Sequence, residues 1–192
     1  MSKVKGEPVR AFASFQRWEA WLVKNHQRSS GLWLRLYKKG SGIPSVSYAE
    51  ALDGALCCGW IDAQKDKFDA GSWLQRFCPR RPKSQWSKRN IAHVARLTKA
   101  GRMQAAGLAE VAAAKKDGRW AAAYDPPSQH EVPADFLAAL AKDKKALAFF
   151  ATLNRANTYG IAYRLQTAKK PETRARRFEA LLALLKKGQK LH

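Results

Sequence analysis

The sequence predicts an α+β fold, in which a small three-stranded sheet is packed by helices and followed by a helical C-terminal part. The pattern of apolar and polar residues suggests strands in three short segments, all of them before residue 79. After Ser84 the apolar residues recur at helical spacing instead. Hydrophobic residues make up 46% of the chain and charged residues 27%, which is typical of a globular protein and excludes a disordered one.

The first helix and the first strand are expected within residues 14–37. Ser14 can cap a helix that ends near His26 and whose apolar stripe consists of Phe15, Trp18, Trp21 and Leu22. In the segment 32–37, three leucines share one face at period two, while Trp33, Arg35 and Tyr37 share the other. This alternation predicts a strand.

A second helix is marked at both ends. Ser47 and Glu50 have the spacing of a capping box, in which the serine accepts from the Glu50 amide and the Glu50 side chain reaches back. We therefore expect the helix to begin at Tyr48, to continue to about Cys58 and to end at Gly59.

Two further strands form an expected hairpin. The segments 60–68 and 73–78 read as strands, and the residues between them, Asp69-Ala70-Gly71-Ser72, have the composition of a turn. Three strands suffice for a small antiparallel or mixed sheet.

The second half of the chain is expected to be helical. Apolar spacing, Pro171 at a first helical position and glycine terminators indicate helices within 84–101, 104–116, 133–153, 155–167 and 171–188. One long connection contains two adjacent prolines. We expect an α+β core domain at 1–118, a linker at 119–132 and a helical subdomain at 133–192.

The net charge of +21 is unevenly distributed. Residues 76–192 carry 25 basic and 8 acidic side chains, whereas residues 1–75 carry 11 and 7. Such a field attracts nucleic acid, anionic lipid or phosphorylated metabolites without choosing among them. A general preference for Lys and Arg on the surface is the alternative explanation of the excess.

The cysteines and the N-terminal residues indicate the cellular compartment in which the protein is expected. Cys57, Cys58 and Cys78 cannot all pair with one another, which favours a reducing environment. The N-terminal segment lacks an apolar run of signal-peptide length, and no later run approaches the roughly 20 apolar residues of a membrane span. We expect a cytoplasmic protein without a transmembrane segment.

The stretch from Arg76 to Asn90 interleaves cations, prolines, serines and aromatics and contains no acidic residue. Its two prolines restrict the backbone, so we expect the cations on a stiff loop that binds phosphate, sulfate or carboxylate. The ligand-binding residues expected there are Arg76, Arg80, Arg81, Lys83, Ser84, Trp86, Lys88 and Asn90. Internal pairing of the arginines and a core position for Trp86 are the alternatives.

Four more residues are expected beside this loop: Asp53, Cys58, Trp60 and Asp62. Two carboxylates near arginines could act as general acid or base if burial or crowding moved one pKa toward neutrality. We favour a structural role, in which Asp53 and Asp62 pair with Arg76, Arg80 or Arg81 and hold the loop against the sheet.

Catalysis by cysteine and binding of metal are both disfavoured. Cys58 lies at the end of the expected helix, where the dipole raises the pKa of a thiol. The histidines are scattered, and no CxxC, HxxxH or HExxH spacing occurs. We expect no cofactor and no metal.

Nonspecific nucleic-acid binding remains an open alternative. Nine basic and no acidic side chains lie between Arg76 and Arg102, and nine basic against two acidic lie between Arg164 and Lys190. No recognition-helix pattern, zinc finger, RNP motif or GxxG clamp accompanies them. A membrane-surface role is weaker, because the last helix interleaves its charges with leucines that suit a core.

Several fragments occur together and in order: Tyr48 to Asp53, Cys58 to Asp62, the basic stretch, Gly101-Arg102-Met103, Asp117 to Trp120 and Lys169 to Arg174. With them the chain resembles the YdeI/OmpD-associated family over nearly its whole length. The resemblance implies a compact α+β unit followed by a helical part, and a role in bacteriocin protection and in tolerance of cationic antimicrobial peptides. It implies no catalytic residues, and the expected cytoplasmic location argues against association with an envelope protein.

These observations together predict a non-enzymatic bacterial protein that binds an anionic small molecule through the Arg76 to Asn90 loop. The alternatives are nonspecific nucleic-acid binding and an enzyme that uses Asp53, Asp62 or Cys58.

Overall fold

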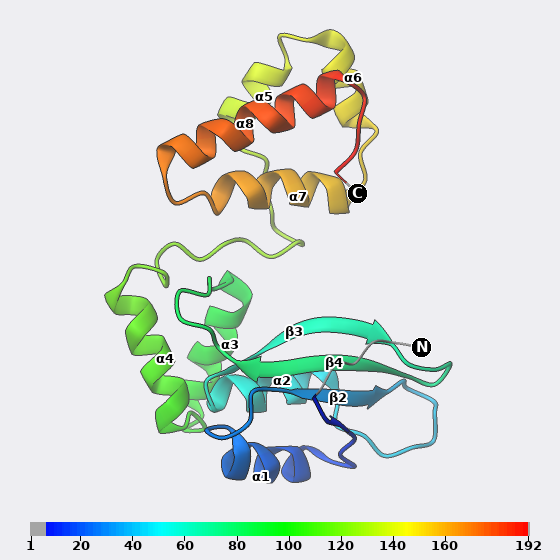
Figure 1. The fold of residues 1–192 in the computed structure, drawn as a ribbon, viewed down its shortest axis with the longest axis vertical. Coiled ribbons are helices and arrows are strands. Elements are labelled where there is room, and N and C mark those ends of the chain that lie inside the picture. Colours follow the sequence, from blue (N-terminus) through cyan, green and yellow to red (C-terminus); the bar gives the residue numbers. More distant parts are fainter. Residues whose placement is uncertain (1–6, 192) are drawn as a thin grey trace. The chain divides into compact units, whose positions relative to one another are not determined.

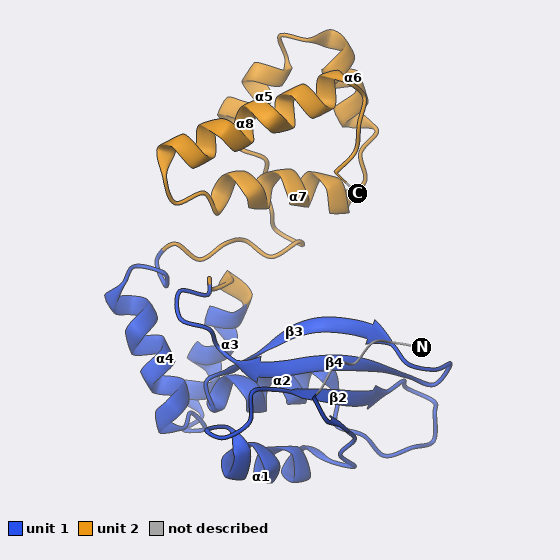
Figure 2. Cartoon of the chain, in the orientation of Figure 1, with its two compact units in different colours: residues 1–84, 90–121 blue, residues 85–89, 122–192 orange. Residues whose placement is uncertain are grey.

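The computed structural model describes residues 7–191 (Figure 1), and these fall into two compact units (Figure 2). The N-terminal unit contains the residues up to Ser84 and those from Asn90 to Ala121. The C-terminal unit contains Gln85–Arg89 and the residues from Ala122 onward. The expected linker at 119–132 stays a proposal, since compactness alone does not show which segments fold independently.

The N-terminal unit is built on a mixed sheet of four strands: β1 (Val9–Arg10), β2 (Leu32–Tyr37), β3 (Trp60–Lys67) and β4 (Ser72–Pro79). Their order is β1-β2-β4-β3, with β1 parallel to β2 and the other pairs antiparallel. The α+β class is confirmed, but the expected count of three strands is wrong. Strand β1 was missed because two residues are too few to show a period-two pattern.

One face of the sheet is covered by helices α1 (Phe15–Asn25) and α2 (Tyr48–Cys57), as Figure 1 shows. Leu32 on β2 lies opposite Phe77 on β4, and the Phe77 ring is 5.5 Å from the ring of Trp18 on α1. The three leucines of β2 are fully buried on this face. Alternation along β2 and β4 places the neighbouring residues on the opposite face.

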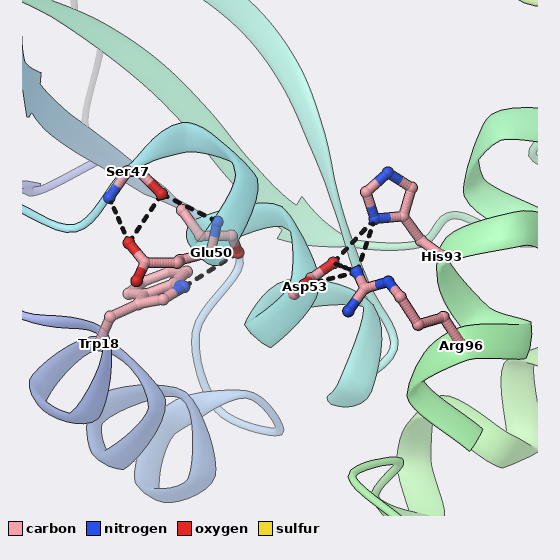
Figure 3. Close-up of polar contacts among 7 residues, drawn as sticks. Trp18, Ser47, Glu50, Asp53, His93 and Arg96 are labelled. Atoms are coloured by element: carbon pink, nitrogen blue, oxygen red, sulfur yellow. Dashed lines mark hydrogen bonds and ion pairs between the residues drawn. The ribbon is translucent and has the colours of Figure 1, made fainter. Parts of the chain in front are cut away.

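Helix α2 begins as its capping box requires. Ser47 Oγ accepts from the Glu50 amide at 3.3 Å, and a Glu50 carboxylate oxygen accepts from the Ser47 amide at 2.8 Å (Figure 3). The indole of Trp18 donates to the Ala51 carbonyl at 3.0 Å and thereby fastens α1 to α2. Gly59 follows with φ of 74°, a conformation that favours glycine at the end of a helix.

Two more helices complete this unit, α3 (Lys88–Lys99, whose first two residues belong to the C-terminal unit) and α4 (Ala105–Lys116). Helix α4 approaches the end of α2 closely at Gly107. A Cβ added there would lie 2.8 Å from the Leu56 carbonyl oxygen and closer still to that of Cys57. The amide of Gln104 also donates to the Cys57 carbonyl at 3.0 Å, which holds the start of α4 against the end of α2. At position 107, only glycine fits this close approach.

The C-terminal unit contains four helices: α5 (Ala134–Leu140), α6 (Lys144–Ala151), α7 (Arg155–Gln166) and α8 (Pro171–Lys186). The expectation of a helical C-terminal part is confirmed. Side chains of all four helices form its core: Phe136, Leu140, Ala146, Ile161, Leu165, Leu181 and Leu185. Asp143 and Asn154 cap α6 and α7 through their side chains.

Within residues 7–191, no helix combines the length and the apolar character that crossing a bilayer would demand.

Candidate functional site

Arg76, the first residue of the basic stretch, is occupied by an ion pair. Its guanidinium donates from Nε to Glu7 Oε2 at 2.7 Å and from Nη2 to Glu7 Oε1 at 2.5 Å. These hydrogen bonds hold the pKa of the Glu7 carboxyl below its ordinary value. The two-point contact joins the residues before β1 to β4 and takes up much of the hydrogen-bonding capacity of Arg76.

Arg80 is also used inside the N-terminal unit. It is only 6% exposed, donates from Nη1 to Ser84 Oγ at 3.1 Å, and its amide donates to the Gly59 carbonyl at 3.1 Å. The Ser84 carbonyl in turn accepts from Nη1 of buried Arg119 at 3.0 Å. The chain between β4 and α3 is therefore held by internal arginine contacts.

Arg81 and Lys83 differ from these neighbours. Both side chains are exposed, and neither makes an ion pair or hydrogen bond through its side chain with any residue that the structure describes. Lys83 has φ of 66°, the one positive φ outside glycine in the described chain. These two cations face solvent at the tip of the basic stretch.

Trp86 and Lys88 belong to the C-terminal unit. The Trp86 side chain is 2% exposed, so it presents no open ring face. Lys88 Nζ lies 2.6 Å from a carboxylate oxygen of Asp125, and the backbone of both residues bonds to Tyr124. Asn90, in the first turn of α3, is half-buried.

Asp53 binds partners that the sequence reasoning did not name. His93 Nδ1 lies 2.8 Å from its Oδ1, and Arg96 Nη2 lies 2.6 Å from each of its oxygens (Figure 3). Pairing of Asp53 with Arg76, Arg80 or Arg81 was therefore wrong. Arg76 follows the alternation of β4 onto the face of the sheet opposite α2, out of reach of Asp53.

The hydrogen bonds in this cluster indicate which ring nitrogen of His93 carries the proton. Arg96 can only donate, and its Nη2 is 3.2 Å from His93 Nδ1, so the carboxylate is the acceptor for both groups. Burial acts to raise the pKa of the Asp53 carboxyl, but the hydrogen bonds from Arg96 and His93 outweigh it and lower the pKa from 3.8. Nδ1 of His93 thus carries the proton, and Nε2 is left as an acceptor when the ring is neutral.

An imidazole oriented by a carboxylate is one part of an acid–base apparatus. The described residues supply no second part, since no hydroxyl or thiol among them hydrogen-bonds to His93. As it stands, the cluster of Asp53, His93 and Arg96 fastens α3 to α2.

Asp62 likewise does not pair with the basic stretch. Its Oδ2 accepts from Tyr48 Oη at 2.7 Å. Asp62 lies opposite Phe77 in the sheet and so shares the face covered by α2, where Tyr48 is the first residue of the helix. The expected pairing with Arg76, Arg80 or Arg81 was wrong for this geometric reason.

Cys58 and Trp60 are parts of the core. Burial raises the pKa of the Cys58 thiol to about 11, and the same cause raises that of Cys57 to about 11. Trp60 is 1% exposed, and its indole donates to the His26 carbonyl at 3.0 Å. Neither residue offers a reactive or open surface to a ligand.

The sequence reasoning missed a pocket in the C-terminal unit. It has a volume of about 420 Å³ and is lined by Gln85, Tyr163, Arg164, Thr167 and Arg177. The sequence signal was present in part, because both arginines lie in the stretch that was noted for its basic character. Helical spacing alone could not show that Arg164 on α7 and Arg177 on α8 line the same hollow.

Hydrogen bonds give this pocket a fixed wall. Arg177 Nη1 donates to the Arg164 carbonyl at 2.8 Å and to Thr167 Oγ1 at 3.4 Å. Gln85 accepts from Tyr163 Oη at 3.2 Å and donates to the Thr167 carbonyl at 3.3 Å. Neither arginine makes an ion pair with a carboxylate in the part of the chain that the structure describes.

Comparison with known families assigns both parts of the chain. Residues 10–110, more than half of the 192 residues, match the family described as a domain of unknown function, DUF8412. The chain belongs to the DUF8412 family. Residues 129–188 match the family described as Bacteriocin-protection, YdeI or OmpD-Associated, which confirms the resemblance seen in the sequence. No curated protein and no solved structure matches the chain.

The two families divide the features described above. The cluster around Asp53 lies in the segment that matches DUF8412, as do the fragments 48–53 and 58–62 that suggested the bacteriocin-protection family. Four of the five residues that line the pocket lie in the YdeI or OmpD-associated segment, and the fifth, Gln85, comes from the basic stretch. Within the described residues, no group of three or more His, Cys, Asp or Glu side chains is arranged to hold a metal ion.

Proposed function

We propose that this protein binds a small phosphate- or carboxylate-bearing anion without transforming it, and that the pocket lined by Arg164 and Arg177 is the principal site. The observation that carries this proposal is the state of Arg177. Two acceptors fix its Nη1, no carboxylate neutralises it among the described residues, and it lines a hollow.

The free edge of Arg177 has the geometry that an oxyanion needs. A guanidinium has five N–H groups, and the two acceptors described above engage Nη1 alone. Nε and Nη2 remain, and this edge forms two parallel hydrogen bonds to a carboxylate or phosphate. Holding the side chain in place beforehand reduces the entropy lost on binding.

The surrounding charge favours an anion over a cation. The C-terminal unit carries 15 basic and 6 acidic side chains. In the N-terminal unit, exposed Arg81 and Lys83 add positive charge, which accelerates the encounter with anions at low ionic strength. We therefore keep the basic stretch in the proposed function, with Gln85 as the residue that lines the pocket and the exposed cations as attracting groups.

At the level of the cell, we propose the role that the family description names, protection against bacteriocins, and extend it to cationic antimicrobial peptides and other stress. We propose a cytoplasmic location, which suits three buried, unpaired cysteines. A non-enzymatic role fits the lack of a hydroxyl or thiol partner for His93 among the described residues.

A thermal-shift panel tests the proposal. Phosphate, citrate and short oligonucleotides are added separately to the full chain, because a ligand that binds the folded state raises its melting temperature. We expect phosphate or citrate to raise the melting temperature of the wild type and to have much less effect on Arg177→Gln. The matched control is Arg176→Gln, an exposed neighbour on α8 that loses the same charge outside the pocket.

Two results would refute the proposal. If Arg176→Gln and Arg177→Gln lose the shift equally, the anions respond to overall charge and not to the pocket. If only oligonucleotides shift the melting temperature, and their effect falls steeply with salt, the protein is a nonspecific nucleic-acid binder instead.

A further inference from the structure

A second hollow lies in the N-terminal unit, beside the start of α1. It has a volume of about 580 Å³ and is lined by Ala11, Phe12, Ala13, Arg17, Ala20 and Trp21. Three of these residues are alanines, which leave room over the larger side chains. The hollow therefore combines two aromatic rings with one guanidinium and little else.

The indole of Trp21 is held rigidly. It stacks on Trp18 with centroids 5.6 Å apart and an angle of 6° between the rings, and it meets Trp60 edge-on at 5.9 Å. Both of these tryptophans are buried, and their indole N–H groups donate to the carbonyls of Ala51 and His26. Trp21 itself is only half-buried, so a fixed aromatic surface reaches the hollow.

Two cations lie at this surface. Arg17 lines the hollow, and Cζ of Arg10 lies over the Trp21 ring, 6.0 Å from its centroid. Both side chains are exposed, and neither forms an ion pair with any described carboxylate. Glu19, the acidic residue of α1, is 3.8 Å from Arg102 instead. Their charges are thus available to an incoming anion.

An aromatic ring stacks on a flat π-system, and guanidinium groups bind phosphate as well as carboxylate. A small molecule that carries a planar ring and a phosphate satisfies both groups. We propose that this hollow binds a nucleoside monophosphate, with the base against Trp21 in place of the exposed Arg10 side chain, and with the phosphate bound by Arg17 and the displaced Arg10. This site would give the DUF8412 segment a ligand of its own, separate from the anion pocket of the C-terminal unit.

Calorimetric titration with AMP tests this site. The Arg177→Gln variant of the chain is used throughout, so that phosphate binding at the pocket of the C-terminal unit is strongly weakened. We expect AMP to bind at least about tenfold more tightly than ribose 5-phosphate or adenosine, because each of these lacks one of the two recognised groups. Equal binding of AMP and ribose 5-phosphate would overturn the proposal.

Substitutions locate the binding. Arg17→Gln is expected to weaken the affinity for AMP by about tenfold. Arg28 is an exposed arginine just beyond α1, and Arg28→Gln is expected to leave this affinity unchanged. The indole N–H resonance of Trp21, assigned from the Trp21→Phe variant, should move during the titration. A resonance that stays fixed, or equal losses in the two arginine variants, would contradict the assignment. The anion pocket at Arg177 and the nucleotide site at Trp21 use different residues. The experiments can therefore refute either proposal while the other stands.

Discussion

Asp53 on α2 accepts hydrogen bonds to both of its carboxylate oxygens from a single nitrogen of Arg96 on α3, at 2.6 Å each. The carboxylate side chain is 12% exposed, whereas that of Arg96 is 54% exposed. Asp53 is therefore the desolvated member of the pair, and removal of Arg96 leaves a buried carboxylate with one partner fewer.

Asp53→Asn is expected to lower the free energy of unfolding by about 1 to 3 kcal/mol, because charged hydrogen bonds to two α3 side chains are weakened. Arg96→Gln should also be destabilising, because it leaves the buried Asp53 carboxylate with His93 and fewer donors. Urea denaturation of both single variants and of the double variant measures the coupling. Strictly additive losses would show that the pair does not interact.

The same carboxylate predicts how stability depends on pH. Its pKa is lowered from 3.8 in the folded protein, so folding favours the ionised form. The stabilisation is fully present above about pH 5 and is lost as the pH falls through the folded pKa. The stability difference between wild type and Asp53→Asn should therefore shrink as the pH falls below this point. A difference that widened below about pH 5 would contradict this assignment.

The adjacent thiols of Cys57 and Cys58 should react slowly. Burial raises both pKa values from 9.0 to about 11, which lowers the thiolate fraction near neutral pH about a hundredfold. We expect almost no labelling of either residue by iodoacetamide in the native protein at pH 8, and rapid labelling in guanidinium. Peptide mapping distinguishes them from Cys78. Fast native labelling of Cys58 would reopen the possibility of a catalytic cysteine.

Gly107→Ala should destabilise the N-terminal unit, although alanine is the better helix former. The added methyl group would press against the carbonyls of Leu56 and Cys57. Overpacking of this kind costs about 1 to 3 kcal/mol, more than the gain in helix propensity. Chemical denaturation provides the measurement. A stabilised variant would show that α4 does not approach α2 as closely as described.

Regular elements could be predicted from the sequence because each has a local signal. The capping box placed the start of α2 at Tyr48, and alternating leucines identified β2 with its observed bounds. Strand β1 had no such signal. Its two residues pair with β2 through backbone hydrogen bonds, and the Glu7 to Arg76 contact beside it joins residues far apart in the chain.

The candidate site could be predicted less well, because pairing depends on which face a residue takes in three dimensions. Asp53 and Asp62 were correctly expected to serve as partnered carboxylates, but their partners were wrong. Alternation turns Arg76 away from α2, and His93 reaches Asp53 only because α3 packs beside it. The pocket of Arg164 and Arg177 depends in the same way on how α7 and α8 pack.

Calorimetric titration of inorganic phosphate into the full chain tests the central claim most directly. The wild type should bind phosphate, Arg177→Gln should bind it at least about tenfold more weakly, and Arg176→Gln should match the wild type. Equal affinities for all three proteins, or equal weakening in the two variants, would contradict a site built around Arg177.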